Sequence, residues 1–180
     1  MISSIPHLLY HQGLRYSETT AQLTKDVKGV FQPTSYKELM NQMLDFAGGL
    51  LSLGTQKGEH IGHISDNRAE WQIISIGIMS TSCSDIPRGT DVTTKELSYI
   101  LGFTNCRTVC VENPYVLGKL CEIISELPKL FDIFFEKSFG VVSGILQALC
   151  CCLLWQEVLV FLLHLQKQMG QPRRMQESIL

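Results

Sequence analysis

Polar and charged side chains concentrate at positions 65–71, in the sequence SDNRAEW between a short apolar segment and a long one. Carboxylates and a guanidinium placed there could bind a ligand or move a proton, because α/β proteins often bind ligands where a strand gives way to a helix. A structural interpretation accounts for the same residues as a helix cap at Asn67 or Asp66, a pairing of Arg68 with Glu70 or a neighbouring acid, and a core anchor at Trp71. We favour the structural interpretation.

Two histidines and one charged pair are the other candidates for chemistry. His60 and His63 are three residues apart in a predicted strand, so they point to opposite faces and cannot readily share a metal. Asp85 and Arg88 flank Pro87; Arg88 could face a nucleotide or acyl chain, but a surface ion pair is the commoner arrangement. No cysteine or serine lies in a recognisable nucleophile motif. The sequence therefore predicts no catalytic, cofactor-binding or metal-ligating residue.

Strand and helix patterns alternate from residue 5 to about residue 136. Short strands are predicted at His60–Ile64, Ser84–Ile86 (closed by Pro87), Thr108–Val111 and Leu130–Phe135. Helices are predicted to begin at Asp66 or Asn67, at Thr93 or Thr94, and at Pro114, and the first of them is apolar nearly all round over Ile73–Met79. This order requires right-handed crossovers, so the predicted fold is α/β, with a mainly parallel sheet and flanking helices.

An earlier amphipathic helix has the strongest local signals. Ser35 and Glu38 have the spacing of a capping box, and apolar residues then recur at three- and four-residue intervals as far as Gly54, which can form a left-handed cap. The pair Gly48-Gly49 inside this helix costs roughly 1 kcal/mol per glycine relative to alanine. A close approach of the helix to the sheet is the expected reason for this pair.

Four motifs agree in order and spacing with one protein family. They are TSYKEL at 34–39, LLSLG at 50–54, SDNRAEW at 65–71 and DIPRG at 85–89. Together they resemble the N-terminal portion of the long-chain fatty acid–CoA ligases, members of the AMP-binding, adenylate-forming superfamily, over roughly residues 5 to 135. The resemblance implies an incomplete N-terminal subdomain over residues 1–137. It also implies ATP-dependent activation of a fatty acid to an acyl-adenylate, followed by a thioester with coenzyme A.

The family's ATP and magnesium are held by segments that this sequence does not contain. The resemblance implies a Ser/Thr/Gly-rich phosphate loop ending in Pro-Lys-Gly, later residues for adenine, ribose and magnesium, and a lysine on a mobile C-terminal domain. Gly170-Gln171-Pro172-Arg173 is a poor match, because the bulky Lys167, Gln168 and Met169 precede it where small residues should expose backbone N–H groups. We expect a truncated chain that binds neither ATP, Mg²⁺ nor coenzyme A and is inactive alone.

Residues 138–180 form a second region with a different composition. Ser138–Gln156 contains no charged residue, and about 18 such residues is the usual criterion for a membrane-spanning helix. One explanation is a membrane segment over residues 139–163, which would make the protein a non-enzymatic, membrane-associated one. The other is a shifted reading frame that replaced the family's sequence with a non-homologous apolar tail. We favour the shifted frame.

Composition limits the partners and the compartment. A net charge of −2 and a pI near 6.2 provide no basic surface, so we expect no nucleic-acid partner. The seven cysteines are single in apolar segments or consecutive at Cys150–Cys152, which is not a disulfide framework. The stretch from Met1 to Tyr10 lacks the pattern of an export signal. We expect buried, reduced thiols in a cytoplasmic protein, with membrane association through residues 139–163 as the alternative.

Overall fold

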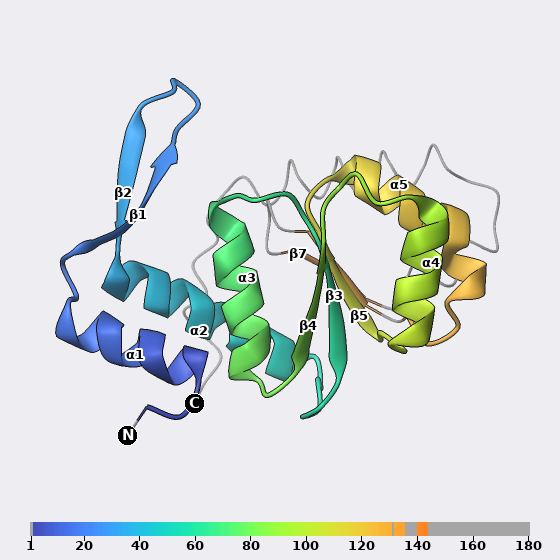
Figure 1. Cartoon of the computed structure of the whole chain (residues 1–180), viewed down its shortest axis with the longest axis horizontal. Helices are drawn as coiled ribbons and strands as arrows, with labels where there is room; N and C mark the ends of the chain where they lie inside the picture. The colour runs from blue at the N-terminus through green and yellow to red at the C-terminus, as the bar shows by residue number, and fades with distance from the viewer. Residues whose placement is uncertain (1, 131, 136–139, 144–180) are drawn as a thin grey trace, which may run out of the picture. The chain divides into compact units, whose positions relative to one another are not determined.

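A computed structural model describes residues 2–130, 132–135 and 140–143 of the chain (Figure 1). Its main sheet has the strand order β4-β3-β5-β6-β7. The strands are β3 (His60–Ile64), β4 (Ser84–Arg88), β5 (Thr108–Val111), β6 (Asp132–Phe135) and β7 (Gly140–Ser143). The first four strands of the sheet are parallel, and β7 pairs with β6 in the antiparallel sense. The predicted α/β fold with a mainly parallel sheet is confirmed.

Helices cover both faces of this sheet. They are α2 (Tyr36–Ser52), α3 (Ala69–Ser80), α4 (Thr94–Phe103) and α5 (Pro114–Ile123), which continues into the short 3-10 helix η1 (Ile124–Glu126). A further helix, α1 (Ile5–Arg15), packs against α2 and α3. Figure 1 shows α2 and α3 on one side of the strands and α4 and α5 on the other. The core on the α2–α3 side contains Leu50, Ile61 and Ile74, which are at most 1% exposed. The arrangement is therefore a parallel sheet between two helical layers.

Local capping signals fix the starts of three helices. Ser35 accepts a hydrogen bond from the Glu38 N–H at 3.2 Å while the Glu38 carboxylate accepts from the Ser35 N–H at 2.8 Å, so the predicted capping box is confirmed. A second box caps α4 through Thr93. Asn113 caps α5, and Pro114 lies in its first turn as predicted. Each box supplies acceptors to N–H groups that a helix start leaves without a partner.

The predicted cap of α3 at Asn67 or Asp66 is wrong. Arg68 is the N-cap residue, and no side chain caps this helix. The Asp66 carboxylate instead accepts hydrogen bonds from Thr90, in the loop after β4. The prediction that α3 is apolar nearly all round is confirmed, since every residue from Ile73 to Ile78 is buried.

The interpretation of Gly48-Gly49 as a point of close approach is also wrong. Both glycines are exposed, and a Cβ at either position would have no heavy atom within 4 Å. The close approach occurs at Gly77 of α3, where a Cβ would lie 2.5 Å from Phe46 Cδ1 and 3.2 Å from the Met43 carbonyl oxygen. Helices α2 and α3 therefore pack together only because residue 77 lacks a side chain.

Strand β4 does not end at Pro87, as the sequence had predicted. Strand β4 continues through Pro87 to Arg88 and pairs with β3 along its whole length. Because β4 is an edge strand, a residue that lacks an N–H can be placed so that no ladder hydrogen bond is lost. The predictions for the strands at residues 60–64 and 108–111 are confirmed, and the strand expected within 130–135 is β6.

An antiparallel two-stranded ribbon, which the sequence did not predict, precedes α2. Its strands are β1 (Thr20–Lys25) and β2 (Phe31–Ser35), and it projects from the N-terminal end of α2 (Figure 1). Asp26 organises the turn by accepting hydrogen bonds from the Lys28 and Val30 N–H groups at 2.8 and 2.9 Å. The bond from Val30, followed by one from the Gln32 side-chain amide, lowers the pKa of the Asp26 carboxyl.

The four cysteines within the described residues are free thiols. Cys83, Cys106 and Cys110 are buried and Cys121 is partly buried, in agreement with the expected reduced cysteines. Burial raises the pKa of the Cys106 thiol, although a contact with the Thr104 hydroxyl opposes this shift. A thiol with a raised pKa is a weak nucleophile, which favours a structural role for this residue.

The apolar tail lies largely outside the described residues. Of the segment 139–163, only residues 140–143 are described, and they form β7. None of the helices in the described part of the chain is long and apolar enough to span a bilayer. The two explanations for the tail, and the boundary at residue 137, stay predictions.

Candidate functional site

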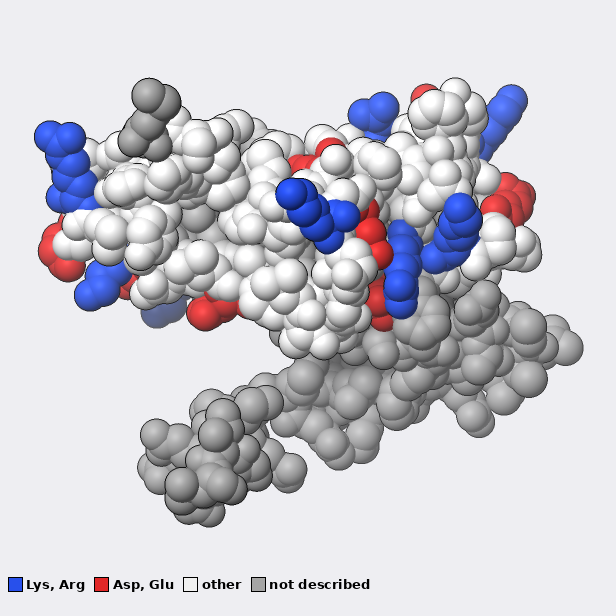
Figure 2. Space-filling view, turned by 90° about the horizontal axis from the view of Figure 1, so that it is seen from below, with Lys and Arg blue, Asp and Glu red and all other residues white. Residues whose placement is uncertain are grey.

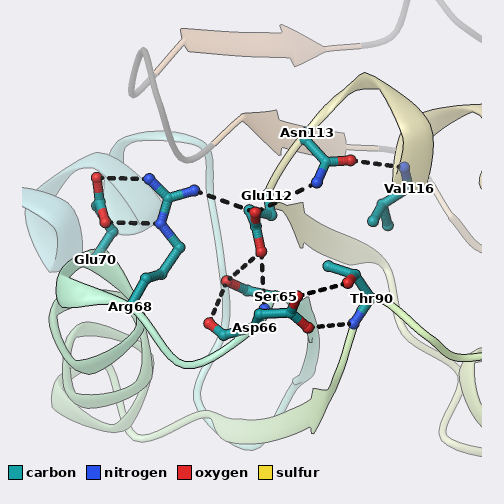
Figure 3. A network of polar contacts seen from close by, with 8 residues as sticks. All are labelled: Ser65, Asp66, Arg68, Glu70, Thr90, Glu112, Asn113 and Val116. Carbon is teal, nitrogen blue, oxygen red and sulfur yellow. Dashed lines mark hydrogen bonds and ion pairs between the residues drawn. The ribbon is translucent and has the colours of Figure 1, made fainter. Parts of the chain in front are cut away.

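The carboxyl ends of β3, β4 and β5 meet at one edge of the sheet, and a polar network joins the loops that follow them (Figure 3). Glu112, directly after β5, is its centre. One carboxylate oxygen, Oε2, accepts hydrogen bonds from the Asp66 N–H at 2.8 Å and from the Ser65 hydroxyl at 3.5 Å. The other, Oε1, accepts from the Asn113 side-chain amide at 3.3 Å. Glu112 therefore ties the β5–α5 loop to the β3–α3 loop.

Arg68 extends this network to the start of α3. Its Nε and Nη2 donate to the two carboxylate oxygens of Glu70 at 2.8 and 2.9 Å, so the predicted pairing is confirmed. Its Nη1 lies 3.5 Å from Oε1 of Glu112, and both side chains are only partly exposed. A bidentate pair fixes the plane of the guanidinium as well as its position. The positive charge of Arg68 is thus shared between two carboxylates of the protein itself.

Asp66 joins the β3–α3 loop to the β4–α4 loop. Its two carboxylate oxygens accept hydrogen bonds from the Thr90 N–H at 2.9 Å and the Thr90 hydroxyl at 2.8 Å. Both bonds favour the charged form and lower the pKa of the Asp66 carboxyl. In the same loop, the Thr90 and Val92 carbonyl oxygens accept hydrogen bonds from the Lys119 ammonium at 2.9 and 2.7 Å. These contacts hold the three loops in one arrangement.

A buried polar cluster lies under α3, beside this network. The Ser75 hydroxyl donates to Oδ2 of Asp85 at 2.6 Å, and Oδ1 of Asp85 lies 3.6 Å from Nδ1 of the fully buried His63. The His63 ring stacks on Trp71 with a centroid separation of 5.4 Å. Asp85 therefore faces the helix and not Arg88, so the predicted ion pair between Asp85 and Arg88 is wrong. Arg88 instead donates to the Pro87 carbonyl at 3.0 Å.

The two histidines lie apart, as predicted. His60 is exposed at the start of β3, whereas His63 is buried on the face that α3 covers. Among the residues that the structure describes, no group of three or more His, Cys, Asp or Glu is placed to hold a metal ion. On the face drawn in Figure 2, Lys and Arg side chains are interspersed with Asp and Glu, without a continuous basic patch.

A cleft of about 1060 Å³ opens beside the polar network. Its walls come from α3 and the loop before it, from Glu112, from Ile5 and from consecutive residues of β1, Gln22 to Lys25. Arg68 and Trp71 contribute to this lining. The cleft is large enough for a cofactor or for a short stretch of polypeptide.

The polar side chains at the cleft are poorly suited to bind the phosphates of a nucleoside triphosphate. A phosphate site needs N–H donors or cations that remain available. Here the Asp66 N–H donates to Glu112, and Arg68 contacts both Glu70 and Glu112. The carboxylates of Asp66 and Glu112 would in addition repel phosphate. The side chains of Asp66, Arg68 and Glu112 are therefore engaged within the protein, whereas the first N–H groups of α3 have no side-chain acceptor.

Sequence reasoning did not single out Glu112 or Thr90. Both follow the end of a parallel strand, the position already recognised as significant for residues 65–71. An acid directly after the buried strand Thr108–Val111 was therefore a usable signal. Its partners, 46 residues earlier in the chain, become evident only when the strand order places β5 beside β3.

Comparisons with known proteins agree with this geometry. The profile of a family described as "AMP-binding enzyme" matches residues 10–138. Two Arabidopsis thaliana proteins are similar to the chain: the long-chain-fatty-acid–[acyl-carrier-protein] ligase AEE15 is 32% identical over 113 residues, and long chain acyl-CoA synthetase 8 is 28% identical over 113 residues. These matches cover 61% and 63% of this chain but only 16% of each relative.

Solved structures show the same fold. The anthranilate CoA ligase AuaEII, in complex with anthranoyl-AMP, superposes with a TM-score of 0.67 at 22% identity. The superposition covers 74% of this chain and 25% of that protein. The chain therefore belongs to the AMP-binding enzyme family, and its first part resembles the N-terminal portion of the long-chain fatty acid–CoA ligases.

Proposed function

We propose that this chain is the first part of an ATP-dependent ligase that activates a long-chain fatty acid through an acyl-adenylate. The observation that carries the proposal is the family match over residues 10–138, together with the fatty-acid ligases among its relatives. In such an enzyme the described residues act as a scaffold. They hold three loop positions at the carboxyl edge of the sheet, and other parts of the enzyme bind the nucleotide.

Coenzyme A is the thiol acceptor that we propose. The name of long chain acyl-CoA synthetase 8 supports this acceptor, whereas the name of AEE15 specifies an acyl carrier protein. An acyl carrier protein is therefore the alternative acceptor. The two are distinguished by supplying the complete enzyme with fatty acid, ATP and either coenzyme A or holo acyl carrier protein. Thioester formed with coenzyme A supports the proposal, and thioester formed only on the carrier protein overturns it.

We propose further that the 180-residue polypeptide forms no acyl-adenylate alone. The sequence contains no phosphate loop, and the Arg68 side chain at its cleft contacts Glu70 and Glu112. The test is fatty-acid-dependent exchange of labelled pyrophosphate into ATP by the purified chain. We expect exchange no greater than that of a buffer blank. Exchange that saturates with ATP and requires the fatty acid would overturn the proposal.

A non-enzymatic membrane-associated protein is the second candidate, because Ser138–Gln156 contains no charged residue. This candidate predicts membrane association that resists carbonate extraction and is lost when residues 138–180 are deleted. Extraction of the full chain by carbonate would exclude it. The nucleotide sequence after codon 137 is an independent check, because ligase-like sequence in another frame there supports the shifted-frame explanation.

A further inference from the structure

Two histidines on α1, the first helix of the chain (Figure 1), bring their ring nitrogens together. His7 and His11 are four residues apart, so they lie on one face of the helix, one turn from each other. Their Nε2 atoms are 2.9 Å apart, and the ring centroids are separated by 4.6 Å. His7 is partly exposed and His11 is exposed. Neither histidine lines the cleft beside the polar network, so the pair is separate from the site described above.

The contacts of His7 with Ser3 decide which ring nitrogen can bind a metal. The Ser3 N–H donates to His7 Nδ1 at 3.3 Å, so Nδ1 carries no proton in this arrangement. The neutral ring then has its proton on Nε2, which can donate to His11 Nε2. The Ser3 hydroxyl also lies 3.2 Å from Nδ1. When the proton is on Nδ1 instead, this hydroxyl can accept a hydrogen bond from it, and both Nε2 lone pairs are available to one ion.

The separation of the two Nε2 atoms suits a particular coordination geometry. An ion about 2.05 Å from each nitrogen would have them at an angle of about 90°. Neighbouring ligands in octahedral and square-planar complexes have this angle, whereas a tetrahedral site needs the nitrogens about 3.3 to 3.4 Å apart. Tetragonal sites with nitrogen ligands are typical of Cu²⁺ and Ni²⁺, and tetrahedral sites are typical of Zn²⁺.

We propose that His7 and His11 form a two-histidine site for Ni²⁺ or Cu²⁺ on the surface of α1, with water in the remaining coordination positions. The proposal goes beyond the proposed function and does not depend on it. The bound ion would link successive turns of α1. Because an isolated helix of 11 residues is marginally stable in water, this link should make α1 more resistant to local opening. A simple hydrogen bond between the two rings is the competing explanation, and it predicts no response to the metal.

The charges on α1 leave the two imidazoles as the source of the affinity. Arg15 is the only Lys, Arg, Asp or Glu in this helix, so no carboxylate of α1 balances the charge of the ion. The guanidinium of Arg15 lies over the Tyr16 ring, 5.3 Å from its centroid, at the other end of the helix. The N-terminal end of a helix also disfavours a cation. Removal of either histidine should therefore abolish most of the binding.

Isothermal titration of the full chain, without a polyhistidine tag, tests the site. Ni²⁺ is the probe, because the soft thiols of the seven cysteines would compete for copper and zinc. We expect binding at least tenfold weaker in His7→Ala and in His11→Ala. The double variant should bind no more weakly than either single variant, because one imidazole alone forms no chelate. His60→Ala is the matched control, since His60 is exposed at the start of β3, and its affinity should equal that of the unmodified chain.

Hydrogen exchange gives a second readout that is local to the helix. Saturating Ni²⁺ should slow exchange of the α1 amides in the unmodified chain and in His60→Ala, but not in His7→Ala. Zn²⁺ at the same concentration should slow it less, because its tetrahedral preference does not match the 2.9 Å separation. Circular dichroism of each variant without metal verifies that the fold persists.

Two results would overturn the proposal. One is a Ni²⁺ affinity that neither His7→Ala nor His11→Ala changes, which would assign the binding to other groups. The other is slowing of the α1 amides by Zn²⁺ that equals or exceeds the slowing by Ni²⁺, which would contradict the class of ion. The titration also tests the expectation, drawn from the sequence, that no residue ligates a metal.

Discussion

The parallel sheet and the β1–β2 ribbon differ in how their surfaces are covered. In the sheet, Ile61, Val109 and Val111 are fully buried between two helical layers. In the ribbon, Leu23, Val27 and Phe31 are all more than half exposed. The sheet thus has its packing partners within the described residues, whereas in the ribbon Ala21 packs against the core and the residues nearer the turn are exposed. The difference indicates that side chains in the sheet contribute far more to the stability of the fold than side chains near the turn of the ribbon.

The largest expected effect separates the two regions by stability. Ile74 is 1% exposed in the core between α3 and the sheet, so Ile74→Ala should lower the free energy of unfolding by about 2–5 kcal/mol. Leu23→Ala in the ribbon should change it by no more than about 0.5 kcal/mol. Urea unfolding followed by circular dichroism measures both. Similar losses in the two variants would contradict the division into a buried unit and an exposed one.

A pair of glycines tests the packing of α2 on α3. Gly77→Ala places a methyl group against Phe46 and the Met43 carbonyl and should cost about 1–3 kcal/mol. Gly48→Ala, in open space on α2, should instead stabilise the helix by up to about 1 kcal/mol. Thermal unfolding midpoints of the two variants should therefore move in opposite directions. A shift in the same direction would disprove the assignment of the contact to Gly77.

The polar network at the carboxyl edge should contribute less to stability than the core around Ile74 does. Glu112 is 17% exposed and accepts the Asp66 N–H, so Glu112→Ala should cost about 1–3 kcal/mol. Glu122→Ala, at an exposed position on α5, is the control and should leave stability nearly unchanged. The expected local signature is faster exchange of the Asp66 amide. Unchanged exchange there would show that Glu112 does not hold the β3–α3 loop.

The smallest expected effect is a change in acid sensitivity. Thr90 lowers the pKa of Asp66 below its usual value of 3.8, so this carboxylate stabilises the fold fully above that pH. Its contribution is lost as the pH falls through the lower pKa of the folded state. Asp66→Asn should therefore flatten the decline of stability below about pH 4. An acid-unfolding curve identical to that of the unmodified chain would mean that the loop contact carries no pH dependence.

Sequence reasoning succeeded where local signals decide the structure. The capping box at Ser35 and the parallel strands follow from spacing within a few residues. It failed where a distant group competes for a side chain. Asp66 has the right type for a helix cap, but Thr90, 24 residues later in the chain, takes its carboxylate. Gly48-Gly49 and Gly77 all lie inside apolar helical segments. Only the packing of α2 against α3 shows that Gly77 is the position where a side chain does not fit.

The ribbon and the centre of the site were missed for related reasons. The ribbon's turn depends on Asp26 accepting backbone N–H groups, a geometry that composition alone does not specify. Glu112 becomes central only when β5 pairs beside β3. The absence of a metal-ligating or catalytic residue stays a prediction, and the arrangement of Arg68 with Glu70 supports the structural interpretation of their segment.

Nucleotide binding by the isolated chain tests the central claim most directly, because Arg68, Asp66 and Glu112 at the carboxyl edge of the sheet are already engaged with groups of the protein itself. Isothermal titration of the 180-residue polypeptide with ATP and Mg²⁺, and with a non-hydrolysable acyl-adenylate analogue, measures this. The account predicts no saturable heat with either ligand. Stoichiometric binding of either one that Arg68→Met abolishes would contradict it, because Arg68 would then contact phosphate in place of Glu70 and Glu112.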